Sequence, residues 1–176
     1  MTIKPPVVKI VGSCGLNTQK FEMTLTKNTF IGEYSYSLDS KGRINIPSKF
    51  RQALSKENQD TFVITRGLDS CIWVYPLMQW KQIEKDLRNL SSLSKIHRAF
   101  IRNTARYATP STYDKQGRIK LTPSLIEYSF LNKEILIIGM VNKIEIWDPN
   151  QLSKIDNNIS KINPEEYDAL SDKIVL

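Results

Sequence analysis

The hexapeptide DSKGRI at residues 39–44 recurs as DKQGRI at residues 114–119, 75 positions later. In each copy aliphatic residues follow at alternating positions, and then a proline, Pro47 in the first copy and Pro123 in the second. Further along, IWVYP at residues 72–76 corresponds to IWDP at residues 146–149. Repeated motifs in the same order indicate two copies of one supersecondary unit. Such internal pseudo-symmetry suits a pseudo-symmetric partner, for which double-stranded DNA is a natural candidate.

Each hexapeptide has the composition of a tight turn between two strands. Asp39 and Asp114 stand where an aspartate side chain can accept hydrogen bonds from backbone N–H groups two residues further on. Gly42 and Gly117 stand where the chain reverses, and glycine adopts the positive φ that such reversals need. The sequence therefore predicts the same turn twice.

The two turns also carry cations at fixed positions. Arg43 and Arg118 directly follow the glycine, and Lys41 and Lys115 lie close before it. A guanidinium held by strand geometry can donate two parallel hydrogen bonds to guanine or to a phosphate, and β-ribbons can enter the major groove. Each arginine can equally pair with the aspartate four residues before it. The residues alone leave both readings open, a DNA contact or an ion pair within the turn.

The pattern around the turns predicts short strands and helices. Helices are expected to begin at Pro47 and Pro123. The run of four aliphatic residues at 135–138 is typical of a strand buried on both faces. Apolar residues at 80, 83, 87 and 90 form one helical stripe and predict a helix, which the serine-rich segment 91–94 ends. A second helix is expected from about residue 95 to 107. Strands are expected at residues 33–38, 43–46, 61–65, 71–75, 134–139 and 143–147.

Length and charge limit the possible classes of protein. A chain of 176 residues is expected to form one or two small domains. Its net charge of +7 favours a polyanionic partner without naming one. No stretch approaches 18 consecutive apolar residues, so no membrane span is expected. Cys14 and Cys71 are expected to be unpaired thiols in a reducing cytosol.

Sequence motifs of catalysis and metal binding are lacking. His97 is the only histidine, and with two distant cysteines it gives no zinc ligand set. There is no Gly-x-Ser-x-Gly elbow, no phosphate-binding loop and no dinucleotide-binding glycine pattern. We therefore expect no enzymatic activity, no metal and no cofactor. Trp73 and Trp147 hold matching positions in the two halves and are expected to pack in the core, with stacking on a base as the alternative.

The two units together resemble the MraZ family, whose repeats are of the SpoVT/AbrB type. The resemblance spans about residues 30–152 and implies an α+β, mainly β fold. In that fold two tandem units form a pseudo-symmetric, swapped-hairpin β-barrel with connecting helices. The matching segments are FIGEY at 30–34, LDSKGRINIP at 38–47, YP at 75–76, DKQGR at 114–118 and NKIEIWD at 142–148.

The resemblance also implies a function. It implies a sequence-specific DNA-binding transcriptional regulator of the bacterial cell-division and cell-wall gene cluster. Such a regulator is expected in the cytoplasm at the nucleoid, as a ring-shaped homo-oligomer that binds short tandem promoter repeats. Arg43 with Lys41 is then the first expected DNA contact, and Arg118 with Lys115 the weaker equivalent. The alternative is a protein-interaction module, an antitoxin-like scaffold.

The expected organisation follows from the same resemblance. Residues 33–79 are the first SpoVT/AbrB-like unit, residues 80–107 a helical connector, and residues 108–151 the second unit. Residues 1–28 are expected to be a disordered extension or an upstream mis-start. Residues 152–176 are expected to be a polar, loosely held tail.

Overall fold

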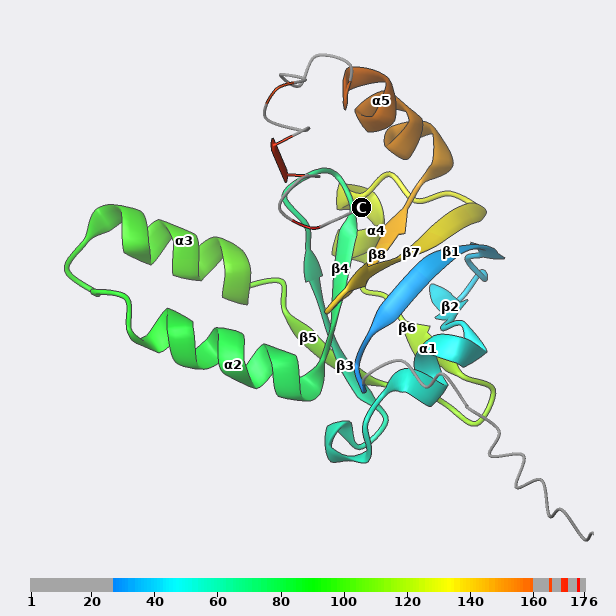
Figure 1. The fold of residues 1–176 in the computed structure, drawn as a ribbon, viewed down its shortest axis with the longest axis horizontal. Coiled ribbons are helices and arrows are strands. Elements are labelled where there is room, and N and C mark those ends of the chain that lie inside the picture. Colours follow the sequence, from blue (N-terminus) through cyan, green and yellow to red (C-terminus); the bar gives the residue numbers. More distant parts are fainter. Residues whose placement is uncertain (1–26, 160–164, 166–168, 171–173, 175–176) are drawn as a thin grey trace, which may run out of the picture.

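The computed structural model describes residues 27–159, 165, 169–170 and 174. Each unit folds as a strand, a turn, a short strand, a short helix and a hairpin (Figure 1). The first unit consists of β1 (Phe30–Ser37), β2 (Arg43–Asn45), α1 (Ser48–Ala53), the 3-10 helix η1 (Lys56–Asn58), β3 (Thr61–Arg66) and β4 (Ile72–Pro76). The second consists of β5 (Thr109–Thr112), β6 (Arg118–Lys120), α4 (Pro123–Tyr128), β7 (Glu134–Val141) and β8 (Ile144–Trp147).

The two units exchange their first strands. β1 of the first unit pairs antiparallel with β7 of the second, and β5 of the second unit pairs with β3 of the first. Six strands thereby form one antiparallel sheet in the order β1-β7-β8-β4-β3-β5. The predicted mixture of helices and mainly antiparallel strands is confirmed, and neither unit completes its part of the sheet alone.

The closed barrel that we expected is not found among the described residues. The strand order begins at β1 and ends at β5, so the six-stranded sheet is open. The short strands β2 and β6 pair only with each other, as a separate two-stranded ribbon. Pro47 and Pro123 follow soon after these strands, and because proline has no N–H to donate, both strands end before them.

The hydrophobic core joins residues of both units. Ile44 and Ile119 lie opposite each other in the ribbon, and each is only 1% exposed. The Phe30 ring from β1 packs edge-on against Phe50 of α1, with ring centroids 5.4 Å apart. Phe62 of β3 also packs near Phe30, with ring centroids 6.3 Å apart. Aromatic contacts of this kind hold β1 in the core, although β1 pairs with a strand of the other unit.

The sequence predicted that the aliphatic run in β7 is buried on both faces. The structure contradicts this prediction. Ile135 and Ile137 are buried, whereas Leu136 and Ile138 between them are only half-buried. The helix α5 (Pro149–Ile159) contacts β7. In this protein the continuous apolar run therefore belongs to a strand with one buried face and one half-buried face.

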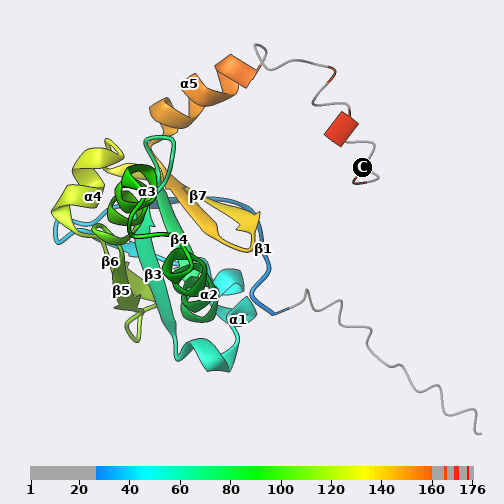
Figure 2. The ribbon, with the colours of Figure 1, turned by 90° about the vertical axis from the view of Figure 1, so that its left-hand side faces the viewer.

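Two helices between the units form a hairpin that projects from the sheet (Figures 1 and 2). These are α2 (Leu77–Arg88) and α3 (Lys95–Ala105), separated near the predicted break. Trp80 anchors α2 by packing with Val63 and Tyr75. None of the residues of α3 is buried.

Contacts are described next to both predicted ends of the repeated region, at residues 28 and 152. Asn28 belongs to the fold, because its N–H donates to Ala53 O at 2.8 Å and its Oδ1 accepts from the Ser55 N–H at 2.9 Å. At the other end, α5 (Pro149–Ile159) extends beyond residue 152, and Asp148 Oδ1 caps its first turn by accepting the Asn150 N–H at 2.9 Å. Residues 1–26 and most of the tail beyond 159 lie outside the described residues.

In the part of the chain that the structure describes, no helix is long and apolar enough to cross a membrane.

Candidate nucleic-acid interface

The first turn is closed by its own aspartate. Asp39 Oδ1 accepts the backbone N–H groups of Lys41 and Arg43, both at 2.9 Å. The Gly42 N–H donates to Asp39 O at 3.0 Å, and Gly42 adopts a φ of +73°, which other residues rarely adopt. These three hydrogen bonds and the φ of Gly42 together fix the conformation of the turn.

The second turn repeats this geometry 75 residues later. Asp114 Oδ1 accepts the N–H groups of Gln116 at 2.9 Å and Arg118 at 3.0 Å. Gly117 adopts a φ of +77°, and its N–H donates to Asp114 O at 2.8 Å. The repeat in the sequence is therefore a repeat in atomic geometry.

Each arginine forms an ion pair with the aspartate of its own turn, which is one of the two readings that the sequence left open. Arg43 Nε and Nη2 both lie 2.7 Å from Asp39 Oδ2. Arg118 Nε lies 2.9 Å and Nη2 2.7 Å from Asp114 Oδ2. The arginine side chains remain 29% and 25% exposed, respectively. These contacts use one edge of each guanidinium and leave Nη1 for a further acceptor.

The β2–β6 ribbon gathers cations from both units on its outer face. Arg43 pairs in register with Lys120, and Asn45 with Arg118. Since side chains alternate along a strand and the isoleucines between these residues are buried, these four side chains belong to the opposite, outer face. Lys120 is a candidate that sequence reasoning missed, and its position two residues after Arg118 on a strand was the available signal.

Lys41 and Lys115 are exposed on the two turns. They extend the cationic surface beyond the two ends of the short ribbon. All four predicted DNA-contacting residues thus lie on the turns or on the ribbon that joins them.

The ion pairs lower the pKa values of both aspartates. Hydrogen bonds from the Arg43 side chain and backbone lower the pKa of Asp39 from 3.8 to about 2. Arg118 lowers the pKa of Asp114 in the same way, also to about 2. Both carboxylates are therefore fully ionised wherever the protein is expected to work.

We expect NMR titration of the carboxyl carbons to place both midpoints near pH 2. Because the folded pKa lies below the unfolded value, the stabilisation is present above pH 3.8 and is lost as the pH falls toward 2. Arg43→Ala should return Asp39 toward its ordinary pKa and leave Asp114 unchanged. Midpoints near 3.8 in the unaltered chain would show that the ion pairs do not form in solution.

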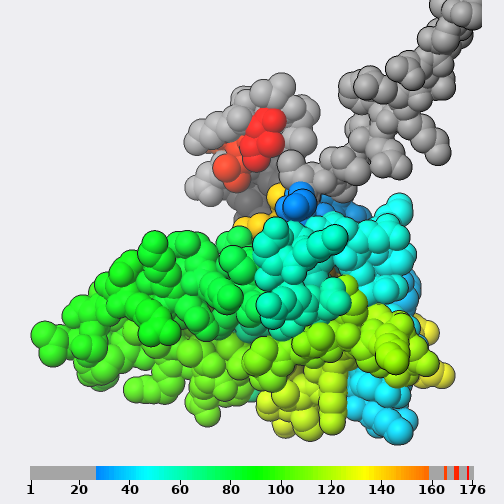
Figure 3. All heavy atoms as spheres, turned by 90° about the horizontal axis from the view of Figure 1, so that it is seen from below, coloured from blue at the N-terminus to red at the C-terminus, as the bar shows by residue number. Residues whose placement is uncertain are grey.

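Each turn also lies against the other unit. The Leu121 N–H donates to Gly42 O at 2.8 Å, and the Ile46 N–H donates to Gly117 O at 2.9 Å. These two bonds are equivalent under the 75-residue repeat. Figure 3 shows the segments around residues 50 and 115 side by side on one face of the molecule. The turns are thus held by tertiary contacts as well as by their own aspartates.

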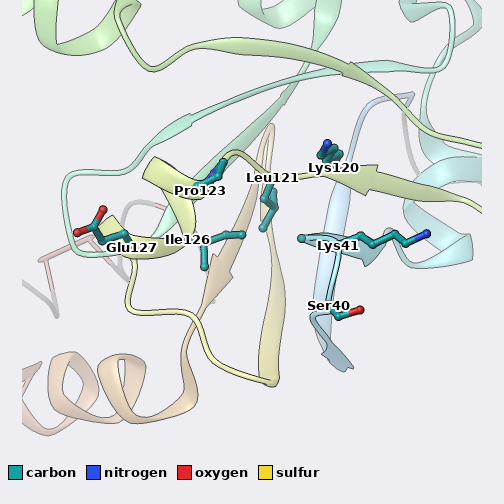
Figure 4. Close-up of a pocket in the computed structure, with 8 residues that line it drawn as sticks. Ser40, Lys41, Lys120, Leu121, Pro123, Ile126 and Glu127 are labelled. Atoms are coloured by element: carbon teal, nitrogen blue, oxygen red, sulfur yellow. The ribbon is translucent and has the colours of Figure 1, made fainter.

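An open groove of about 630 Å³ borders the first turn (Figure 4). Leu121, Pro123 and Ile126 form its apolar part, with Lys41 and Lys120 to one side and Glu127 to the other. Ser40 and Gly42 complete the lining. The groove is therefore continuous with the cationic turn.

The two matching tryptophans meet at one carboxylate. Trp73 Nε1 donates to Glu145 Oε1 at 2.9 Å, and Trp147 Nε1 donates to Oε2 at 3.0 Å. Trp147 is buried and Trp73 is half-buried. This arrangement joins the hairpins of the two units and uses both indole N–H groups.

Among the described residues, His97 has a hydrogen-bond partner and Cys71 is a buried free thiol. His97 Nδ1 accepts the Ser91 N–H at 3.1 Å, which braces the loop between α2 and α3. Burial, with smaller effects from Glu145 and Asp69, raises the pKa of the Cys71 thiol to about 12, so the thiolate is scarce at neutral pH. Cys14 lies outside the described residues. Across residues 27–159 and the few described beyond them, no three His, Cys, Asp or Glu residues are grouped to hold a metal ion.

Comparisons with known proteins agree with the division into two units. A family model described as "MraZ protein, putative antitoxin-like" matches residues 29–103 and again residues 105–172. A protein of Halothermothrix orenii named Transcriptional regulator MraZ is 50% identical over 118 residues, which are 67% of this chain and 80% of that protein. Proteins of the same name from Alkaliphilus metalliredigens and Clostridium acetobutylicum are 39% and 42% identical, and each match covers 82% of this chain and 96% of the relative.

These relatives are named as regulators of transcription rather than as enzymes, in agreement with the expectation that the chain has no enzymatic activity. The family model covers both repeated units, including both Asp-x-x-Gly-Arg turns. The chain belongs to the MraZ family.

Proposed function

We propose that this chain is a sequence-specific DNA-binding regulator of transcription that contacts promoter DNA through its two basic turns. The observation that carries the proposal is the outer face of the β2–β6 ribbon, where Arg43, Arg118 and Lys120 lie together. Lys41 and Lys115 continue this surface onto the turns. A two-stranded ribbon of this size fits the major groove of B-DNA. The names of the relatives support the same role.

The ion pairs within the turns are compatible with DNA contact. Asp39 and Asp114 hold the guanidinium groups of Arg43 and Arg118 through Nε and Nη2. A guanidinium has five donors, so an aspartate on one edge orients the group and leaves donors on the other edge. Such an arginine loses little side-chain entropy when it binds DNA, because its position is already set.

Further features of the proposal follow from the family resemblance. We propose a ring-shaped homo-oligomer that binds short tandem repeats upstream of a cell-division and cell-wall gene cluster, in the cytoplasm at the nucleoid. We also retain the swapped-hairpin description, which the exchange of β1 and β5 between the units supports. A ring requires heterologous contacts. Ile96 and Phe100 on α3 are exposed apolar side chains that such contacts would cover.

We expect Arg43→Ala to weaken specific binding by about tenfold to a hundredfold, the effect of losing one well-made base contact. Lys41→Ala tests the same turn without touching the ion pair, because only the Lys41 backbone N–H bonds Asp39. If Lys41 contacts a phosphate, its loss lowers the slope of log K against log salt by about 0.9. Gel shifts with DNA upstream of the chain's own coding sequence, against scrambled DNA, measure both effects.

Arg88→Ala is the matched control, since it removes an exposed cation at the end of α2, on the projecting hairpin (Figure 1). Arg118→Ala reports whether the second turn reads DNA as well. Normal binding by folded Arg43→Ala and Lys41→Ala proteins would contradict the proposal. Equal binding to scrambled DNA by every variant would instead favour the antitoxin-like, protein-interaction alternative.

A further inference from the structure

The two turns differ at one pair of equivalent helix positions. Arg51 in α1 and Ile126 in α4 are 75 residues apart, as the repeat requires. Each lies against the glycine of the other unit's turn. A Cβ atom added to Gly117 would lie 2.5 Å from Arg51 Cζ, and one added to Gly42 would lie 3.3 Å from Ile126 Cδ1. The same location beside the two turns therefore holds a guanidinium at one turn and an aliphatic side chain at the other.

Within residues 27–159, the contacts described for the Arg51 guanidinium are with a carbonyl, a glycine and a ring rather than with a carboxylate. Its Nε donates to Ile46 O at 3.1 Å, its plane lies against Gly117, and its Cζ is 5.9 Å from the centre of the Tyr113 ring. The ion pairs described for residues 27–159 do not include Arg51, in contrast to Arg43 and Arg118. With Nε occupied, both Nη groups remain as donors. Among the residues that the structure describes, Arg51 is thus an oriented cation beside the second turn that has no ion pair with an acidic side chain.

The corresponding place at the first turn is apolar and open. Ile126 forms the groove of Figure 4 with Leu121 and Pro123, and no arginine fills it. Lys41 and Lys120 border the groove on the side of the ribbon. An apolar surface between cations suits the methyl group of thymine, with the lysines on nearby phosphates. Glu127 closes the far side and would repel a phosphate there.

We propose that Arg51 and Ile126 make the two turns read unlike half-sites in DNA. Arg51 recognises a guanine edge beside the second turn, through its two Nη groups. Ile126 and its groove accept a thymine methyl beside the first turn. This inference rests on the proposed function, and it adds that the operator unit bound by one chain is asymmetric although the fold is pseudo-symmetric.

Exchanging the two residues tests this directly. Arg51→Ile gives the second turn the helix residue of the first, and Ile126→Arg does the reverse. Selection from randomised double-stranded DNA, followed by binding measurements on the selected sites, reports the preferred bases for each variant. We expect Arg51→Ile to weaken binding to the wild-type site by about tenfold to a hundredfold and to change the preference in one half-site only. Ile126→Arg should change the other half-site.

Two further variants separate base reading from charge. Arg51→Lys keeps the charge and loses the bidentate fork, so it should lose the guanine preference while keeping the salt dependence. If Arg51→Ile does not fold, Arg51→Lys still tests the proposal. Arg88→Ile makes the same replacement on the projecting helix α2 and should leave preference unchanged.

The outcomes distinguish this inference from the proposed function. A wild-type chain without any preferred DNA sequence would overturn the proposed function itself. Specific binding by the wild type, with unchanged preferences in Arg51→Ile and Arg51→Lys, would overturn only the role of Arg51. An equal loss on every DNA sequence, with a salt slope lower by about 0.9, would reduce Arg51 to a phosphate contact and also overturn the asymmetric reading.

Discussion

Replacing Phe30 with alanine is expected to lower the free energy of unfolding by about 3–5 kcal/mol. Phe30 is 0% exposed and packs against Phe50 and Phe62. Its strand, β1, is the one that crosses to the second unit and pairs with β7. The substitution would leave a cavity in the core and weaken the attachment of the exchanged strand, since close-packed surroundings relax only in part.

Urea denaturation followed by circular dichroism measures this effect. Phe130→Ala is the matched control, because Phe130 is 56% exposed and the same atoms are removed. We expect the control to change stability by no more than about 0.5 kcal/mol. A loss below about 1 kcal/mol for Phe30→Ala would mean that β1 does not occupy the core position described here.

The second large effect is expected at the carboxylate shared by the two tryptophans. Glu145→Ala should lower the free energy of unfolding by about 2–4 kcal/mol, because the indole N–H groups of Trp73 and Trp147 both lose their acceptor. Lys143, whose Nζ lies 3.7 Å from Glu145 Oε1, would also lose its ionic partner. The substitution should destabilise both units, since each unit contributes one of the two tryptophans.

Tryptophan fluorescence during urea unfolding reports on this site directly. Glu145→Gln retains one acceptor oxygen and should fall between the wild type and the alanine variant. Glu134→Ala removes an exposed carboxylate from the same sheet and should have little effect. If Glu145→Ala were as stable as Glu134→Ala, the two indoles would not depend on this carboxylate.

The local chemistry of the candidate site could be predicted from the sequence. The aspartate, glycine and arginine of each turn act on neighbours at most four residues away. Short-range hydrogen bonds of this kind depend little on the rest of the chain. The strands and helices next to the turns were predicted for the same reason, from alternating or helical spacing within short segments. The sequence left open whether each arginine contacts DNA or forms an ion pair within its turn, since both were sterically possible.

Long-range contacts account for the features that the sequence did not reveal. Asn28 is held by Ala53 and Ser55, and the Arg51 guanidinium lies on Gly117. Lys120 joins the site because β6 pairs with β2, which brings it opposite Arg43. None of these partners is close in sequence, and no periodic pattern marks them.

The sequence by itself determined that the chain contains two copies of one unit, each with a basic turn closed by aspartate and glycine. Those properties arise from interactions between near neighbours, which the order of residues specifies directly. Only the tertiary structure decided that β1 and β5 exchange between the units and that the sheet stays open. It also decided that Arg51 and Ile126 lie against the turns of the opposite units. Strand partners and contacts across the core depend on how the whole chain packs its apolar surface, because alternation shows which face of a strand is buried but not which strand lies beside it.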